Sequence, residues 1–137
     1  MLATVKIFMG IFLTFIMVDL IWLGLVAKSF YLSQLSSLMR FANGQLSPNW
    51  FAGILVYVLF TIGILVFVLP KSQGSLSNAC YYGALFGLVT YGIYDLTNLA
   101  LLANWPLKIV LVDMIWGTAL CSIGGLSAYY FSRYFLS

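Results

Sequence analysis

The hydrophobic residues of this chain gather in four long stretches, and the segments between them hold most of the polar residues. The stretches run over about 5–27, 50–69, 79–102 and 107–131. A transmembrane helix needs about 20 consecutive apolar residues to cross the hydrocarbon core of a bilayer. The pattern therefore predicts an all-α membrane protein, with four transmembrane helices in a compact bundle and residues 1–137 as a single domain.

The longest segment between the stretches covers residues 28–48. Tyr31, Leu35 and Leu38 recur there at helical spacing, and serine side chains fill the opposite side. This pattern is typical of a short amphipathic helix lying in the membrane interface. We predict such a helix over about 29–42, ended by the Asn-Gly pair that follows. It would serve as an interfacial connector or as a lid over the mouth of the bundle.

Composition supports the membrane assignment. The chain is 64% hydrophobic and only 7% charged, whereas about 25% of the residues in a soluble domain are charged. The basic residues are scattered singly near helix ends and in loops, which suits anchors at the lipid interface and not a nucleic-acid-binding surface. The expected partner is the lipid bilayer. Basic residues divide equally between the two sides, so the free amino terminus and the short flanks favour cytoplasmic termini.

All three acidic residues, Asp19, Asp95 and Asp113, lie inside the apolar stretches, and the chain contains no Glu and no His. Without histidine there is no Ser-His-Asp triad, no HExxH zinc site and no His-ligated haem. No nucleophile stands beside an evident base. The sequence therefore favours a protein that is not an enzyme, with no cofactor and no confident metal site.

The three aspartates share a depth. Asp19 and Asp95 lie about two-thirds along spans that run in the same direction, and Asp113 lies about a turn and a half into a span that runs back. All three fall in the half of the membrane that faces residues 28–48. An aspartate at the centre of a transmembrane helix costs about 2.5–3.5 kcal/mol, so we expect all three to face the interior of the bundle.

Each aspartate is followed three positions later by a hydrogen-bond donor. The motifs are 18-VDLIW-22, 94-YDLTN-98 and 112-VDMIW-116, and residues three apart share a helix face. The predicted polar cluster comprises Asp19, Trp22, Tyr91, Asp95, Asn98, Asp113 and Trp116. The predicted supporting or lid residues are Tyr31, Tyr94, Thr97, Trp105 and Lys108.

Three functions remain open for this cluster. The first is binding or transport of a small ligand, a cation or a proton, which for so few helices would call for a homodimer. The ligand would be a small cation or a lipid, with Trp22, Trp116 and Tyr91 offering aromatic faces to a cation. The second is a lipid-handling enzyme or its accessory subunit, with Mg²⁺ or Ca²⁺ held by the acids and Asn98. The third is a structural partner in which the cluster is a hydrogen-bonded staple.

Four segments carry a family resemblance: 19-DLIWLG-24, 83-GALFGLVTYGIYDLTNLA-100, 105-WP-106 and 112-VDMIWGT-118. They resemble a family of small bacterial membrane proteins catalogued as domain of unknown function 2177, over nearly the whole chain. The resemblance implies a four-span, multi-pass protein of the bacterial inner (cytoplasmic) membrane, and it implies no activity. The matching positions include Asp19, Trp22, Gly24, Tyr31, Tyr94, Asp95, Thr97, Asn98, Trp105, Pro106, Asp113, Trp116 and Gly117.

Overall fold

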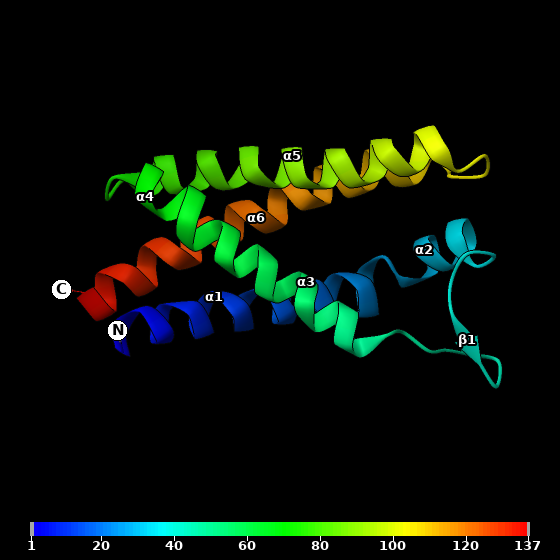
Figure 1. Ribbon diagram of the computed structural model, residues 1–137, viewed down its shortest axis with the longest axis horizontal. Helices are drawn as coiled ribbons and strands as arrows, with labels where there is room; N and C mark the ends of the chain where they lie inside the picture. Colours follow the sequence, from blue (N-terminus) through cyan, green and yellow to red (C-terminus); the bar gives the residue numbers. More distant parts are fainter. Residues whose placement is uncertain (1, 137) are drawn as a thin grey trace.

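The computed structural model describes residues 2–136 and contains four helical stretches long and apolar enough to cross a membrane. They run over Leu2–Val26, Trp50–Ser72, Leu76–Leu101 and Leu107–Leu136. The predicted all-α architecture with four spans is confirmed. Both termini lie at one end of the bundle, and the other end holds the α5–α6 turn and the segment between the first two spans (Figure 1).

Two of the spans contain a π-helical turn. The first consists of α1 (Leu2–Ile21) and η1 (Trp22–Val26), and the second of α3 (Trp50–Gly63), η2 (Ile64–Val68) and α4 (Leu69–Ser72). The second span thus continues to Ser72, beyond Leu69, where the prediction placed its end. Pro70 lies in the first turn of α4, directly after η2, and at that position the missing N–H of proline is tolerated. The remaining spans are uninterrupted, α5 (Leu76–Leu101) and α6 (Leu107–Leu136).

Glycines set the close contact between α5 and α6, two helices that pack against each other extensively. A Cβ atom on Gly83 would meet the carbonyl oxygen of Cys121, and one on Gly87 would meet that of Gly117. Helices in lipid associate through such close backbone approach, because no hydrophobic force drives them together there. The small-residue rows of these two spans therefore fix a tight helical hairpin.

The first span also packs against α6. Ile7, Ile11 and Phe15 of α1 belong to the same buried cluster as Ile64 and Leu120. The ring of Phe15 occupies the space where a side chain at position 124 would lie, and that position is a glycine. This cluster forms the apolar core in the half of the bundle nearer the termini.

The second span crosses the bundle diagonally (Figure 1). Its α3 part contacts α1, whereas η2 and α4 contact α5 and α6. As a result the amino-terminal part of α3 diverges from α5. This divergence leaves space between the two helices.

The amphipathic helix predicted over residues 29–42 is not confirmed. Helix α2 spans only Lys28–Leu35, and a hairpin of β1 (Phe41–Ala42) and β2 (Gln45–Leu46) follows it. Asn43 and Gly44, predicted as a helix cap, form the hairpin turn with φ of 52° and 74°. Positive φ at both central residues is typical of the turns that join two antiparallel strands, and this turn chemistry overrides the helical spacing of the apolar residues.

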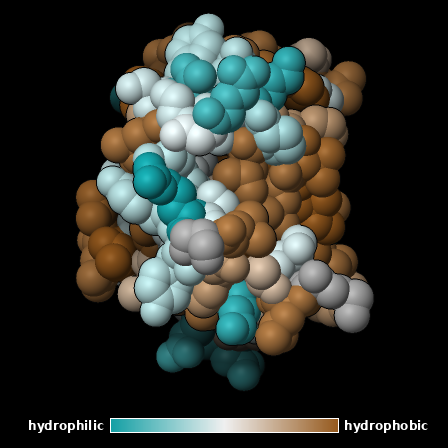
Figure 2. All heavy atoms as spheres, turned by 90° about the vertical axis from the view of Figure 1, so that its left-hand side faces the viewer, coloured by the Kyte–Doolittle hydropathy of each residue, from teal (hydrophilic) through white to brown (hydrophobic). Residues whose placement is uncertain are grey.

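The molecular surface suits a bilayer. Large apolar side chains are exposed on the outward faces of all four spans, among them Leu13, Leu59, Ile93 and Ile115. At the end that carries the termini, hydrophilic atoms form a band down the middle of the face, with hydrophobic atoms on both sides (Figure 2). The polar groups of this end therefore gather where the bundle would meet water and lipid headgroups.

Candidate functional site

A polar layer crosses the bundle at the end opposite the termini. It consists of the three aspartates and the aromatic side chains around them: Asp19, Trp22, Tyr31, Tyr57, Asp95, Trp105, Asp113 and Trp116. Asp19 is 7% exposed and Asp95 0% exposed, and Asp113 is half-buried. None of these carboxyl groups is turned out to lipid, where its cost would be greatest.

Asp19 accepts two hydrogen bonds from two other helices. The Tyr57 hydroxyl on α3 donates to its Oδ2 over 2.6 Å, and the Trp116 indole on α6 donates to its Oδ1 over 2.9 Å. One carboxyl group thus connects α1, α3 and α6. Both donors are neutral, so this arrangement satisfies the hydrogen-bonding capacity of Asp19 without balancing a negative charge.

Asp113 accepts a hydrogen bond from a side chain of α2. The Tyr31 hydroxyl donates a hydrogen bond to Asp113 Oδ1, and the Trp22 indole donates to the Tyr31 oxygen over 3.4 Å. Burial, together with the hydrogen bond to Asp113, raises the pKa of the Tyr31 phenol above its ordinary value. Tyr31 reaches this position because the chain leaves helical geometry at Ala27 after the π-helical turn η1.

Two stacked indoles connect the Asp19 and Asp113 branches. The rings of Trp22 and Trp116 lie 4.2 Å apart between centroids and are inclined by only 7°. Because each ring covers the face of the other, no cation can lie between them. A continuous chain of contacts therefore runs from Asp19 through Trp116, Trp22 and Tyr31 to Asp113.

Asp95 differs from the other two aspartates. Both of its carboxyl oxygens are buried and have no hydrogen-bond partner in the described part of the chain, and the same holds for the indole nitrogen of Trp105. Trp105 lies near Asp95 but does not form a hydrogen bond of standard geometry with it. Buried polar atoms without partners are rare in proteins, so this pair is the chemically unusual part of the layer.

Two of the three donors predicted to accompany the aspartates, Trp22 and Trp116, bond to a residue of another helix. Trp116 follows Asp113 by three residues but donates to Asp19, and Trp22 follows Asp19 but donates to Tyr31. Residues three apart point the same way from one helix, so each donor reaches the neighbouring helix and not its own aspartate.

The other predicted residues have varied positions. Tyr91 lines a pocket beside the layer, and Tyr94 packs edge-on against Trp105 with ring centroids 5.9 Å apart. Asn98 is half-buried and forms no hydrogen bond with Asp95, whose carboxyl oxygens have no partner in the described residues. The structure places Thr97 and Lys108 on the exposed surface.

Tyr57 is the residue that sequence reasoning missed. It binds Asp19 directly, yet the predicted cluster contained no residue from the second span. The composition of the second span could have identified it. Tyr57 is the only tyrosine in that span, and between residues 51 and 69 only Tyr57 and Thr61 have side chains that can donate a hydrogen bond.

The site offers little to a divalent metal. Among residues 2–136 no three His, Cys, Asp or Glu side chains lie close enough together to hold a metal ion. Ca²⁺ takes six to eight oxygen ligands, and Mg²⁺ demands a near-ideal octahedron. Within the described residues the three aspartates therefore do not gather into one shared set of metal ligands.

Comparison with known proteins gives one result. No curated protein and no solved structure matches the chain. A family model described as "Predicted membrane protein (DUF2177)" matches residues 4–130. This match agrees with the resemblance in the aspartate motifs and with the four apolar spans. The chain belongs to the DUF2177 family of predicted membrane proteins.

Proposed function

We propose that the protein is a proton-binding transport protein of the membrane and that Asp95 is its proton-binding residue. The observation that carries this proposal is the burial of both Asp95 carboxyl oxygens without a hydrogen-bond partner. The polar layer would then be a functional site, and uptake or loss of the Asp95 proton would accompany movement of a small ligand.

Charge balance supports a proton at Asp95. The interiors of the four spans contain no Lys, Arg or His, so no basic side chain at that depth offsets the carboxylates. An ionised carboxylate buried without a partner costs several kcal/mol, and such a group is neutralised instead. A proton achieves this and turns one carboxyl oxygen into a donor.

Space favours a proton over a hydrated cation. Asp95 is 0% exposed, which leaves no room at its oxygens for a water-sized group. A proton needs no such room, whereas a metal cation would need further oxygen ligands that must move into place. A cation or proton site was predicted from the sequence, and this packing supports the proton.

The α2 segment suits the role of a lid in this scheme. Tyr31 packs with Ala27 and Ile109 in a small cluster that includes Trp105 at its edge. Displacement of Tyr31 would free Asp113, which acts electrostatically on Asp95, and would expose the layer at the interface. A homodimer would provide enough helices for alternating access, and we place the termini on the cytoplasmic side of a bacterial inner membrane.

Proton flux into proteoliposomes tests the proposal. Purified protein is reconstituted into potassium-loaded vesicles that contain a pH-sensitive dye, and valinomycin drives proton entry. We expect wild-type protein to accelerate entry over protein-free vesicles, and Asp95→Asn to reduce the acceleration by about tenfold or more, equivalent to at least 1.4 kcal/mol. Tyr130→Phe, at an exposed position on α6, is the matched control and should resemble wild type.

Two results would contradict the proposal. Wild-type vesicles that acidify no faster than protein-free vesicles would exclude proton transport. Equal rates for wild type and Asp95→Asn would remove Asp95 from the pathway. Circular dichroism and size-exclusion chromatography establish that both variants remain folded before reconstitution.

Asp19 has a separate, structural role within this proposal. Its two hydrogen bonds connect three helices, which is the arrangement expected of a staple. The staple hypothesis is therefore favoured for Asp19, while the unpartnered oxygens favour function for Asp95.

A further inference from the structure

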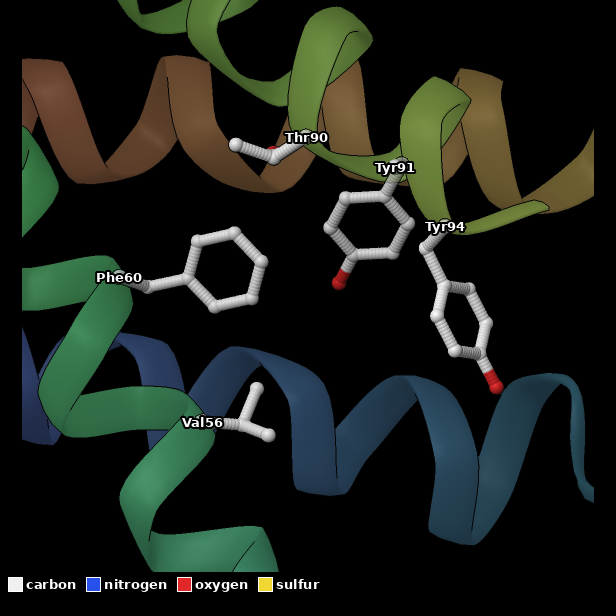
Figure 3. A pocket seen from close by; sticks show the side chains of 5 residues that line it. All are labelled: Val56, Phe60, Thr90, Tyr91 and Tyr94. Carbon is white, nitrogen blue, oxygen red and sulfur yellow. The ribbon is translucent and has the colours of Figure 1, made fainter. Parts of the chain in front are cut away.

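A pocket of ≈ 320 Å³ lies between α3 and α5, beside the polar layer, and Asp95 does not line it. Val56 and Phe60 of α3 form one wall, and Thr90, Tyr91 and Tyr94 of α5 form the other (Figure 3). It fills the space left where α3 diverges from α5. Nothing in the proton-binding proposal uses this pocket.

The pocket extends into a groove that is open to lipid. A second hollow of ≈ 250 Å³ shares Val56, Phe60 and Thr90 with the first and continues to Leu59 and Phe86. Val56 is 47% exposed and Leu59 67% exposed on the outward side. At this depth the outer surface of the bundle meets hydrocarbon, so an occupant would enter sideways from the bilayer.

The inner wall of the pocket carries a free hydroxyl group. The Tyr91 hydroxyl points from α5 toward α1 (Figure 3), and no hydrogen bond from the described residues reaches it. The Tyr91 ring also stacks on Phe60, with centroids 5.6 Å apart and an inclination of 23°. The groove thus has an apolar entrance and a single polar group at its inner end.

The electrostatic environment of that inner end is negative. The Tyr91 ring lies against Gly117 of α6, next to Trp116, whose indole donates a hydrogen bond to Asp19. Asp19 and Asp113 accept hydrogen bonds from Tyr57, Trp116 and Tyr31, all of which are neutral donors. Since the span interiors contain no basic residue, a positive charge beside Tyr91 would be attracted, and a negative one repelled.

We infer that this groove binds a membrane-soluble primary amine in its ammonium form, drawn from the bilayer between α3 and α5. The ammonium group lies beside the Tyr91 oxygen, to which it donates a hydrogen bond, and within reach of the field of Asp19. The alkyl chain lies along Val56, Leu59 and Phe60. Apolar burial supplies affinity, and the carboxylates select the charged head group over a neutral or anionic one.

Photo-crosslinking tests this inference. An n-alkylammonium probe with a diazirine in its chain is added to phosphatidylcholine proteoliposomes, irradiated, and located by peptide mass spectrometry. We expect saturable labelling within residues 56–60 or 90–94. Unlabelled n-octylammonium should compete about tenfold better than n-octanol or n-octanoate at equal membrane concentrations.

Variants locate the site. Val56→Trp fills the groove and should reduce the saturable labelling about tenfold, whereas Ile93→Trp, at a 65% exposed position on α5 outside the groove, should leave it unchanged. Tyr91→Phe keeps the ring and removes the hydroxyl, so it should weaken octylammonium competition about tenfold and octanol competition less, because a hydrogen bond from a charged donor is the stronger one. It also serves as the second test if Val56→Trp does not fold.

Two results of the crosslinking experiment would overturn the inference. Labelling that does not saturate, or that spreads evenly over the lipid-facing surfaces, overturns the groove as a site. Equal competition by n-octanol and n-octylammonium overturns the ammonium assignment. Asp95→Asn should retain the labelling, so a failure of proton flux and a failure of amine binding are separate results.

Discussion

The hydrogen bond from Tyr57 to Asp19 gives a sharp test of how the polar layer holds the bundle together. Tyr57→Phe removes one hydroxyl and keeps the ring, so Asp19 loses the 2.6 Å bond from α3 and retains only Trp116. Asp19 is 7% exposed, which gives water little opportunity to replace the lost donor. The variant therefore leaves a buried carboxyl group half-satisfied.

The expected cost follows from two ranges. Hydrogen bonds between transmembrane helices average about 0.6 kcal/mol and reach about 1.7 kcal/mol, whereas bonds to charged groups contribute about 1.5–3 kcal/mol in proteins generally. Asp19 is a buried carboxyl group with only two donors, so we expect the loss of one hydrogen bond to cost an amount between these two ranges. We expect Tyr57→Phe to lower the free energy of unfolding by about 1.5 kcal/mol.

Reversible unfolding in mixed micelles, with sodium dodecyl sulfate as denaturant and helicity by circular dichroism as the readout, measures this change. Tyr130→Phe removes a hydroxyl from a 60% exposed position and should change the free energy of unfolding by less than about 0.5 kcal/mol. The double variant with Trp116→Phe should cost more than the sum of the single changes, because Asp19 then has no donor. Equal stability of the Tyr57→Phe and Tyr130→Phe variants would refute the role of Asp19 as a link between helices.

Three further predictions concern the rest of the fold. Gly87→Ala places a Cβ against the backbone carbonyl of Gly117 and should destabilise by about 1–3 kcal/mol in the same assay, while Gly53→Ala, with nothing within 4 Å, should be neutral or stabilising by up to about 1 kcal/mol. Folding raises the pKa of Tyr31 above its unfolded value of 10.0. The stabilisation that Tyr31 gives to the folded state is therefore present below pH 10.0 and is lost as pH rises above that value. The difference in stability between wild type and Tyr31→Phe should therefore shrink above about pH 10, and a difference that grows would contradict the bond to Asp113. Gly44→Val forces a β-branched residue to φ of 74° at a local cost of about 1–2 kcal/mol, and should speed proteolysis at residues 41–46 without changing span stability.

Hydropathy alone predicted the four spans because their outward faces are lipid-exposed and apolar along their whole length. It placed the end of the second span too early, since the continuation past Pro70 depends on the π-helical turn η2. The helical spacing of the apolar residues also led us to extend the interfacial helix over residues 36–42, beyond the end of α2 at Leu35. There the Asn43-Gly44 pair adopts positive φ and reverses the chain, a local preference that apolar spacing does not report.

The candidate site was predictable in part, and for a clear physical reason. The cost of a carboxylate in hydrocarbon predicts that all three aspartates face the interior; Asp19 and Asp95 are buried, and Asp113 is half-buried. Which donor binds which acceptor depends on how the helices are rotated and tilted, and the sequence of one helix does not contain that information. The crossing of Trp116 to Asp19, and the arrival of Tyr57 from α3, follow only from the packed structure.

Infrared spectroscopy of the carboxyl groups tests the central claim most directly. The chain has only three side-chain carboxyl groups, so single Asp→Asn variants assign every protonated-carboxyl band apart from that of the chain terminus. We predict a carbonyl stretch of a protonated carboxyl at neutral pH that shifts in D₂O, persists in Asp19→Asn and disappears in Asp95→Asn. If Asp95→Asn leaves the spectrum of protonated carboxyl groups unchanged, Asp95 holds no proton and the proposed function is wrong.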